Sequence, residues 1–235
     1  MPRTLTLRFT FDSKTALQGA RLALEDAGDA QVTLNGEAAA DVDGFYVDKC
    51  IGCRRLPQIV PGCNTLTVRM PYGKTRNVEA CYLLGAFGVN VQGSRASLCP
   101  APQRIAFGDV TRQGYPFYGG NLTYHLEADL APGRYELTAS LYRGHLLRAA
   151  VDGKDAGIIA FSPYALTFDV SQGGMHRIDL TVYGCRINTF GQLHQTDKAH
   201  EWWGPGSWRS TGAEWAYEYC LYPQGVLKSP ELRRL

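Results

Sequence analysis

The sequence predicts an all-β protein made of two tandem antiparallel β-sandwiches, one in residues 1–99 and one in residues 100–235. Three observations lead to this prediction: a hydrophobic period of two, Asn-Gly and Asp-Gly pairs after apolar runs, and the return of the same pattern in the second half. The chain has 235 residues, 45% of them hydrophobic. That is enough to fill one large core or two small ones.

Apolar and polar residues alternate most clearly near the N-terminus. In residues 5–11 (LTLRFTF) the odd positions are apolar and the even ones polar, as a half-buried strand requires. Residues 65–70, 135–141 and 178–182 show a similar alternation. Antiparallel sheets with one solvated face produce this pattern, whereas buried parallel sheets do not. Because no convincing amphipathic stretch of ten residues occurs, we predict strands and turns without long helices.

Turn residues divide these strands into two similar halves. Asn35-Gly36 and Asp152-Gly153 each follow a short apolar run and predict tight hairpins. A Tyr-Gly pair follows in each half, at Tyr72-Gly73 and Tyr183-Gly184, so the order of features is the same. Two copies of one β-sandwich explain this order best. We expect the boundary within residues 97–103, where prolines interrupt the strand pattern.

Several of these segments together carry a family resemblance: Leu34-Asn35-Gly36 and 61–68 (PGCNTLTV) in the first half, Val151-Asp152-Gly153 and 119–124 (GGNLTY) in the second. The pattern resembles the sugar-binding jelly roll of glycoside hydrolase family 2, a galactose-binding-like β-sandwich. The resemblance covers residues 15–75 and 117–190. It implies a jelly-roll fold for both halves and a carbohydrate as the ligand.

The C-terminal stretch, from His200 to Tyr217, is similar to the ends of large bacterial rhamnosidase-like glycoside hydrolases. The resemblance implies that this stretch corresponds to a non-catalytic tail region of those proteins. The related enzymes hold their catalytic carboxylates in a barrel, and a barrel alone takes about 250 residues. The resemblance therefore implies an accessory module that works beside a catalytic barrel outside this chain.

All four tryptophans lie between Trp202 and Trp215. Sugars present C–H faces that stack on aromatic rings, and hydroxyls that need polar partners. The Gly-Pro-Gly-Ser run at 204–207 predicts a loop, where binding residues concentrate. The alternating Trp215, Tyr217 and Tyr219 predict a strand that faces the core. We predict a ligand-binding site formed by residues of the preceding loop: Asp197, His200, Glu201, Trp202, Trp203, Trp208 and Arg209.

The predicted function is non-catalytic recognition of an oligo- or polysaccharide. Glycoside hydrolysis needs two facing carboxylates. Asp197 with Glu201, or Glu201 with Glu214, could be nominated, but the sequence does not show that either pair converges. No G-x-S-x-G nucleophile motif occurs. Two alternatives stay open: a structural or protein-interaction module whose tryptophan loop docks on a neighbouring catalytic domain, and a small jelly-roll glycoside hydrolase.

No cofactor is expected from the sequence. Acidic residues in 41–48 leave a structural calcium ion as one interpretation and a solvated turn as the other, since the EF-hand spacing is not met. Cys50, Cys53 and Cys63 suggest a zinc knuckle, but a second close pair is missing. Arg54-Arg55 is expected to be a solvated basic edge.

Charge and hydropathy exclude two partner classes. The net charge is +2 and the basic residues are scattered, so we expect no nucleic-acid partner. The sequence has no run of eighteen apolar residues, so we expect no membrane span. The N-terminus has no apolar segment typical of a signal peptide, and the seven cysteines, read as free thiols, favour a cytoplasmic location without establishing one.

Overall fold

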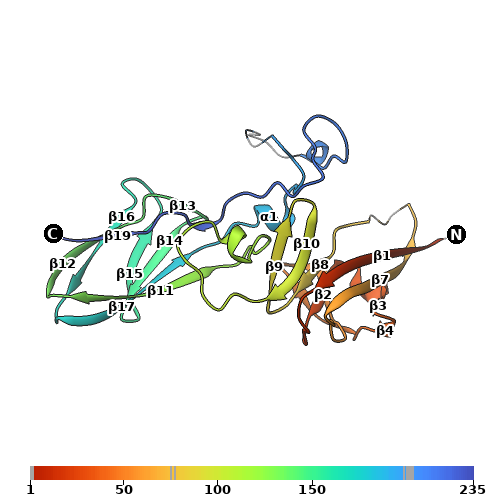
Figure 1. Cartoon of the computed structure of the whole chain (residues 1–235), viewed down its shortest axis with the longest axis horizontal. Helices are drawn as coiled ribbons and strands as arrows, with labels where there is room; N and C mark the ends of the chain where they lie inside the picture. Colours follow the sequence, from red (N-terminus) through yellow and green to blue (C-terminus); the bar gives the residue numbers. More distant parts are fainter. Residues whose placement is uncertain (1–2, 75, 77, 198, 200–203) are drawn as a thin grey trace. The chain divides into compact units, whose positions relative to one another are not determined.

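The computed structural model describes residues 3–74, 76, 78–197, 199 and 204–235 (Figure 1). The chain divides into two compact units, Met1–Pro102 and Gln103–Leu235. Over the described ranges, strands dominate and helices are short: α1 (Ile187–Phe190) and single 3₁₀ turns at Ala27–Asp29, Val110–Gln113 and Pro205–Ser207. The all-β prediction is confirmed. No helix in this described part is long and apolar enough to cross a membrane.

The first unit contains ten strands in its described residues: β1 (Arg3–Ser13), β2 (Arg21–Glu25), β3 (Gln31–Leu34), β4 (Glu37–Ala38), β5 (Val42–Tyr46), β6 (Asp48–Arg55), β7 (Gly62–Tyr72), β8 (Tyr82–Leu84), β9 (Phe87–Gln92) and β10 (Arg95–Pro100). One sheet has the order β4-β3-β7-β1-β10-β9 and the other β5-β6-β2-β8. Neighbouring strands are antiparallel except β1 and β10, which are parallel. β10 runs through Pro100, so the strand pattern continues past the first proline of the expected boundary.

Both sheets of the first unit contribute to one hydrophobic core. Leu22 and Leu24 from β2 lie in the same buried cluster as Leu34 from β3 and Leu66 and Val68 from β7. Since these strands belong to different sheets, the sheets pack face to face as a β-sandwich. The alternating apolar residues of β1 and β7 face this core, as their period of two requires.

The second unit contains the remaining strands of the described residues: β11 (Leu122–Leu130), β12 (Gly133–Thr138), β13 (Tyr142–Arg143), β14 (Leu147–Val151), β15 (Lys154–Ile159), β16 (Ala165–Val170), β17 (Gly174–Val182), β18 (Gly225–Val226) and β19 (Glu231–Arg234). The sheets have the orders β11-β17-β14-β15, β16-β12-β19 and β13-β18. Figure 1 shows β12, β16 and β19 side by side. Leu147 and Leu180 from the first of these sheets share a buried cluster with Leu137 and Phe168 from the second.

The two units have the same order of paired strands. In the first, β4-β3-β7-β1 faces β6-β2-β8, and in the second, β15-β14-β17-β11 faces β16-β12-β19. In each unit the first long strand pairs with the last long strand, which also pairs with the first strand of the Asx-Gly hairpin. The units differ in the connection that follows: residues 73–81 lead from β7 to β8, whereas residues 183–224 lead from β17 to β18.

The hairpin of the first unit turns at Asn35-Gly36, where both residues have positive φ (53° and 88°). Positive φ at both central positions defines a type I′ turn, which explains the Asn-Gly pair. Asn35 Oδ1 accepts the N–H of Thr65 at 2.8 Å, and Asn35 Nδ2 donates to Asn64 Oδ1 at 2.9 Å. Asn64 also donates to Val60 O at 2.8 Å. The buried amide of Asn64 therefore holds the exposed turn residue Asn35 to β7.

The hairpin of the second unit is locked at the equivalent place by different groups. Asp152 and Gly153 have φ of 48° and 77°, and Asp152 Oδ1 accepts the N–H of Arg177 at 3.0 Å. His176 Nδ1 donates to Asp152 Oδ2 at 2.6 Å, and its Nε2 donates to Gln172 O at 2.9 Å. Since both partners only accept, this geometry suits the imidazolium form, and the hydrogen bond to Asp152 raises the pKa of His176.

Two predictions about the first unit are wrong. Arg54 is not a solvated edge: it is 8% exposed and donates to Ala27 O at 2.9 Å and Ala40 O at 3.0 Å. These carbonyls belong to distant loops, so the burial of this charge is not visible in local sequence. The acidic segment 41–48 is not a turn, because most of it forms β5, where Asp43 pairs with Arg21.

The described residues contain no disulfide bond; Cys53 is buried, whereas Cys50 and Cys63 are exposed. Cys50 and Cys53 both lie on β6, three residues apart. Side chains at that spacing point to opposite faces of a strand, which does not suit a shared metal ion. The structure, in the residues it describes, contains no cluster of three His, Cys, Asp or Glu side chains able to hold a metal.

Candidate functional site

The connection 183–224 carries the tryptophan-rich segment of the second unit. Its ends are fastened together, because Asn188 Nδ2 donates to Tyr222 O at 2.8 Å and the N–H of Tyr222 donates to Asn188 Oδ1 at 2.9 Å. Asn188 is buried and lies in α1. Thr189 Oγ1 donates to Phe117 O at 2.8 Å and ties the same helix to the unit. The connection thus leaves the sandwich and returns at one fixed place.

Within this connection, two stretches run antiparallel. The N–H of Thr196 donates to Glu214 O at 2.8 Å, and the N–H of Ala216 donates to His194 O at 2.9 Å. Gln195 and Trp215 form the bridge between them. This short ladder holds the side chains of 214–219 in a defined position without a regular strand.

Five aromatic rings follow this ladder in an unbroken series of contacts, which we call the aromatic row: Phe117, Tyr219, His194, Trp215 and Tyr217. Successive ring centroids are 5.3, 5.1, 6.1 and 4.4 Å apart. These are ordinary distances for aromatic pairs.

One end of the aromatic row is exposed to solvent. Tyr217, at its end, is 74% exposed, while the other rings are partly buried. His194 Nδ1 donates to Ala216 O at 3.0 Å and Glu218 O at 3.3 Å, and since carbonyls only accept, this nitrogen carries the proton. The imidazole is therefore fixed between its neighbours, and the row is a supported aromatic surface.

Polar groups lie on the same connection as the row. Glu214, which precedes Trp215, pairs with Arg209: Nη1 lies 3.2 Å from Oε2, and both side chains are partly exposed. Arg209 Nε also donates to Gly206 O at 2.8 Å, which orients the guanidinium. Gln195 is buried and donates through Nε2 to Glu214 Oε2 at 3.3 Å. Trp208, next to Arg209 in sequence, is 56% exposed.

The predicted site residues have different outcomes. His200, Glu201, Trp202 and Trp203 lie outside the described residues. Asp197 Oδ1 accepts the N–H of Ala199 at 2.9 Å, which closes a local turn. Trp208 and Arg209 lie at the surface, and the structure brings Arg209 to Glu214, a residue that the predicted set did not include.

The expectation that Trp215, Tyr217 and Tyr219 form a core-facing strand is wrong. Over the described part of this segment there is one isolated bridge, at Trp215, and Tyr217 is largely exposed. His194 and Phe117 were not among the predicted site residues. His194 joins the row through pairing with residues 22 and 24 positions later, and no local pattern signals such a contact.

This arrangement can bind a ligand that has apolar faces and polar edges. Tyr217 and Trp208 offer ring surface to solvent, and the Arg209–Glu214 pair offers both donors and acceptors. Exposed aromatic side chains with adjacent polar groups are typical of binding surfaces.

No protein-family model matches the chain, and no curated protein sequence matches it. Among solved structures, it is similar to the rhamnosidase from Novosphingobium sp. PP1Y, with 15% identity, a TM-score of 0.36 and 97% of this chain covered. It is also similar to the Streptomyces avermitilis alpha-L-rhamnosidase complexed with L-rhamnose, with 18% identity, a TM-score of 0.33 and 76% covered. The chain spans 22% of each of these two proteins.

Proposed function

We propose that this chain is a non-catalytic carbohydrate-binding module and that the aromatic row, with Trp208 and the Arg209–Glu214 pair, contacts the glycan. The observation that carries the proposal is the supported, outward-facing ring of Tyr217 at the end of the row. Burying such a ring against the C–H face of a sugar removes apolar surface from water without new strain in the protein.

In this proposal the Arg209–Glu214 pair supplies the hydrogen bonds to the sugar hydroxyls. The carboxylate of Glu214 and the guanidinium of Arg209 are half exposed, so each retains hydrogen-bonding capacity toward solvent or sugar hydroxyls. Hydrogen bonds to charged groups contribute about 1.5–3 kcal/mol each when the partners are well placed. Together with one or two stacked rings, this supports dissociation constants in the micromolar to millimolar range. In this proposal a separate catalytic domain carries out the chemistry.

Glycan-array screening followed by titration calorimetry of the best ligand tests the proposal. We expect Tyr217→Ala and, separately, Trp208→Ala each to weaken binding by about tenfold, the effect of losing one stacked ring worth about 1.4 kcal/mol. Phe161→Ala is the matched control, because Phe161 is 83% exposed in the same unit and lies outside the row.

Three outcomes would overturn the proposal. The first is the absence of any glycan ligand on the array. The second is binding that survives both Tyr217→Ala and Trp208→Ala, which would assign the surface to another domain or chain. The third is turnover of a chromogenic glycoside by this chain that is lost in Glu201→Gln, which would make the protein a hydrolase.

A further inference from the structure

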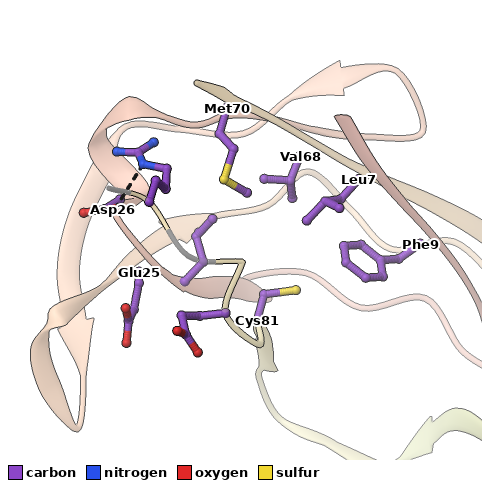
Figure 2. A pocket seen from close by; sticks show the side chains of 10 residues that line it. Leu7, Phe9, Glu25, Asp26, Val68, Met70 and Cys81 are labelled. Carbon is purple, nitrogen blue, oxygen red and sulfur yellow. Dashed lines mark ion pairs between the residues drawn. The ribbon is translucent and has the colours of Figure 1, made fainter. Parts of the chain in front are cut away.

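The first unit contains a cavity of about 150 Å³ that the proposed glycan site does not use (Figure 2). It lies between β1, β7, the end of β2 and the segment that leads to β8. Figure 2 shows Leu7, Phe9 and Val68 on one side and Glu25 and Asp26 on the other. The cavity is therefore two-sided, with an apolar wall and an acidic wall.

The apolar wall is formed by core-facing side chains at the edge of the sandwich, where part of their surface is exposed. Leu7 and Val68 are cross-strand partners, and Val68 is fully buried, so the odd residues of β1 share its core-facing side. Phe9 belongs to this set, yet it is 40% exposed. Its ring therefore faces the cavity with free surface, where an apolar group or a cation can contact it.

The acidic wall has more negative than positive charge. The guanidinium of Arg76 is already occupied, since Nε lies 3.2 Å from Asp26 Oδ2 and Nη2 lies 2.6 Å from Asp29 Oδ2. Glu25 and Glu79 also line the cavity, and among the described residues no basic side chain forms an ion pair with either. Two carboxylates on this wall are thus available to a ligand.

We propose that this cavity binds a small organic ammonium ion, with its apolar body against Leu7 and Phe9 and its ammonium group toward Glu25 and Glu79. A cavity of this volume has room for about one benzene ring. Small-molecule sites in proteins combine an apolar lining with a few convergent polar groups, as this one does.

Cys81 also lines the cavity and provides a built-in reporter. Burial raises the pKa of its thiol, so its reaction with alkylating agents is slow and depends on access from the cavity. Cys63 is exposed on β7 and does not line the cavity, so it serves as an internal control in the same molecule.

Titration of the ¹⁵N-labelled chain with benzylamine, benzyl alcohol and benzoate tests the charge requirement. We expect benzylamine to shift the amide resonances of β1 and β7 and to bind about tenfold tighter than benzyl alcohol, with benzoate weakest. Glu25→Gln with Glu79→Gln should remove this preference for the amine. Glu37→Gln, an exposed carboxylate on β4 outside the cavity, should leave it unchanged.

Alkylation of the thiols, read peptide by peptide with mass spectrometry, tests the location. Benzylamine at ten times its dissociation constant should slow iodoacetamide labelling of Cys81 by about tenfold and leave Cys63 unaffected. Equal binding of all three probes, binding retained by the double glutamine variant, or unchanged labelling of Cys81 would each overturn the proposal. The glutamine substitutions remove only surface charge, so we expect the variants to fold normally. The same amide spectra show whether they do.

Discussion

The two units lock the same hairpin with different chemistry. In the first unit, Asn64 holds Asn35 through neutral amide hydrogen bonds, whereas in the second unit His176 holds Asp152 through an ionisable pair. The backbone parts of the two locks match: each turn residue accepts an N–H from the last long strand and donates its own N–H to a carbonyl of that strand. The geometry of the turn is therefore shared, and only the second lock responds to pH.

The units also differ in where they bury polar groups. In the first, Arg54 and Asn64 are buried within the sandwich itself, where they hold loops to strands. In the described part of the second, all the buried polar side chains belong to the connection 183–224: Asn188, Gln192, Gln195, Ser207 and Gln224. Polar burial thus organises the turns of one unit and the long connection of the other.

The largest effect is expected from Asn64→Ala. Its side chain is inaccessible to solvent, accepts from Asn35 and Val60 and donates to Val60 and Gly62. Removing it leaves buried partners unpaired, so we expect a loss of about 2–4 kcal/mol in the free energy of unfolding. Hydrogen exchange in peptides from β3 and β7 should show the loss. Unchanged protection there would contradict a structural role for the amide pair.

A smaller effect is expected from pH, and only in the second unit. The pKa of folded His176 is raised by its bonds to Asp152 and Gln172, so its contribution is fully present below about pH 6.5 and is lost as pH rises through the folded pKa. All tryptophans belong to this unit, so tryptophan fluorescence follows its unfolding alone. We expect the midpoint denaturant concentration to fall above pH 6.5.

The control for this pH effect is a matched pair of variants. His176→Gln should flatten the fluorescence-detected profile, whereas His125→Gln, on the outer face of β11, should keep it. A profile that His176→Gln leaves unchanged would assign the pH dependence to another group. At acid pH the sign reverses, because the lowered pKa of Asp152 makes its contribution disappear as the carboxylate is protonated.

The smallest change in stability is expected from exchanging one lock for the other. Asp152→Asn with His176→Asn places the two amides of the first unit at the equivalent positions of the second. Because the backbone hydrogen bonds of the turn remain, we expect the hairpin to persist and the pH dependence above pH 6.5 to vanish. Resonances of Gly153 in the unusual positive-φ turn report whether the hairpin is kept. Their loss would show that the two locks are not interchangeable.

Local chemistry made most of the fold predictable. The period of two in residues 5–11 and the Asn-Gly pair at 35–36 depend on neighbours in sequence, and both appear in the structure as β1 and the β3–β4 turn. Arg54 was misjudged because its three acceptors, at residues 27, 28 and 40, are distant in sequence. A run of two arginines signals charge, but nothing in it signals burial.

The candidate site was less predictable for a related reason. Composition located the tryptophan-rich segment, and alternation suggested that Trp215 and Tyr217 belong to a core strand. That alternation arises from extended backbone in a loop ladder, so it has the strand period without a sheet behind it. Similarly, the Glu25–Glu79 side of the cavity depends on two segments 54 positions apart, and no motif joins them.

The reciprocal hydrogen bonds between Asn188 and Tyr222 make the connection 183–224 an insertion whose two ends are joined at the edge of the sandwich. Because its ends meet at one point, the sandwich strands on either side need not change if this connection is shortened or replaced. The entropic cost of such changes is small, because doubling the length of a flexible loop costs only about 0.6 kcal/mol. The sequence of this segment can therefore diverge while the β-sandwich that carries it stays the same.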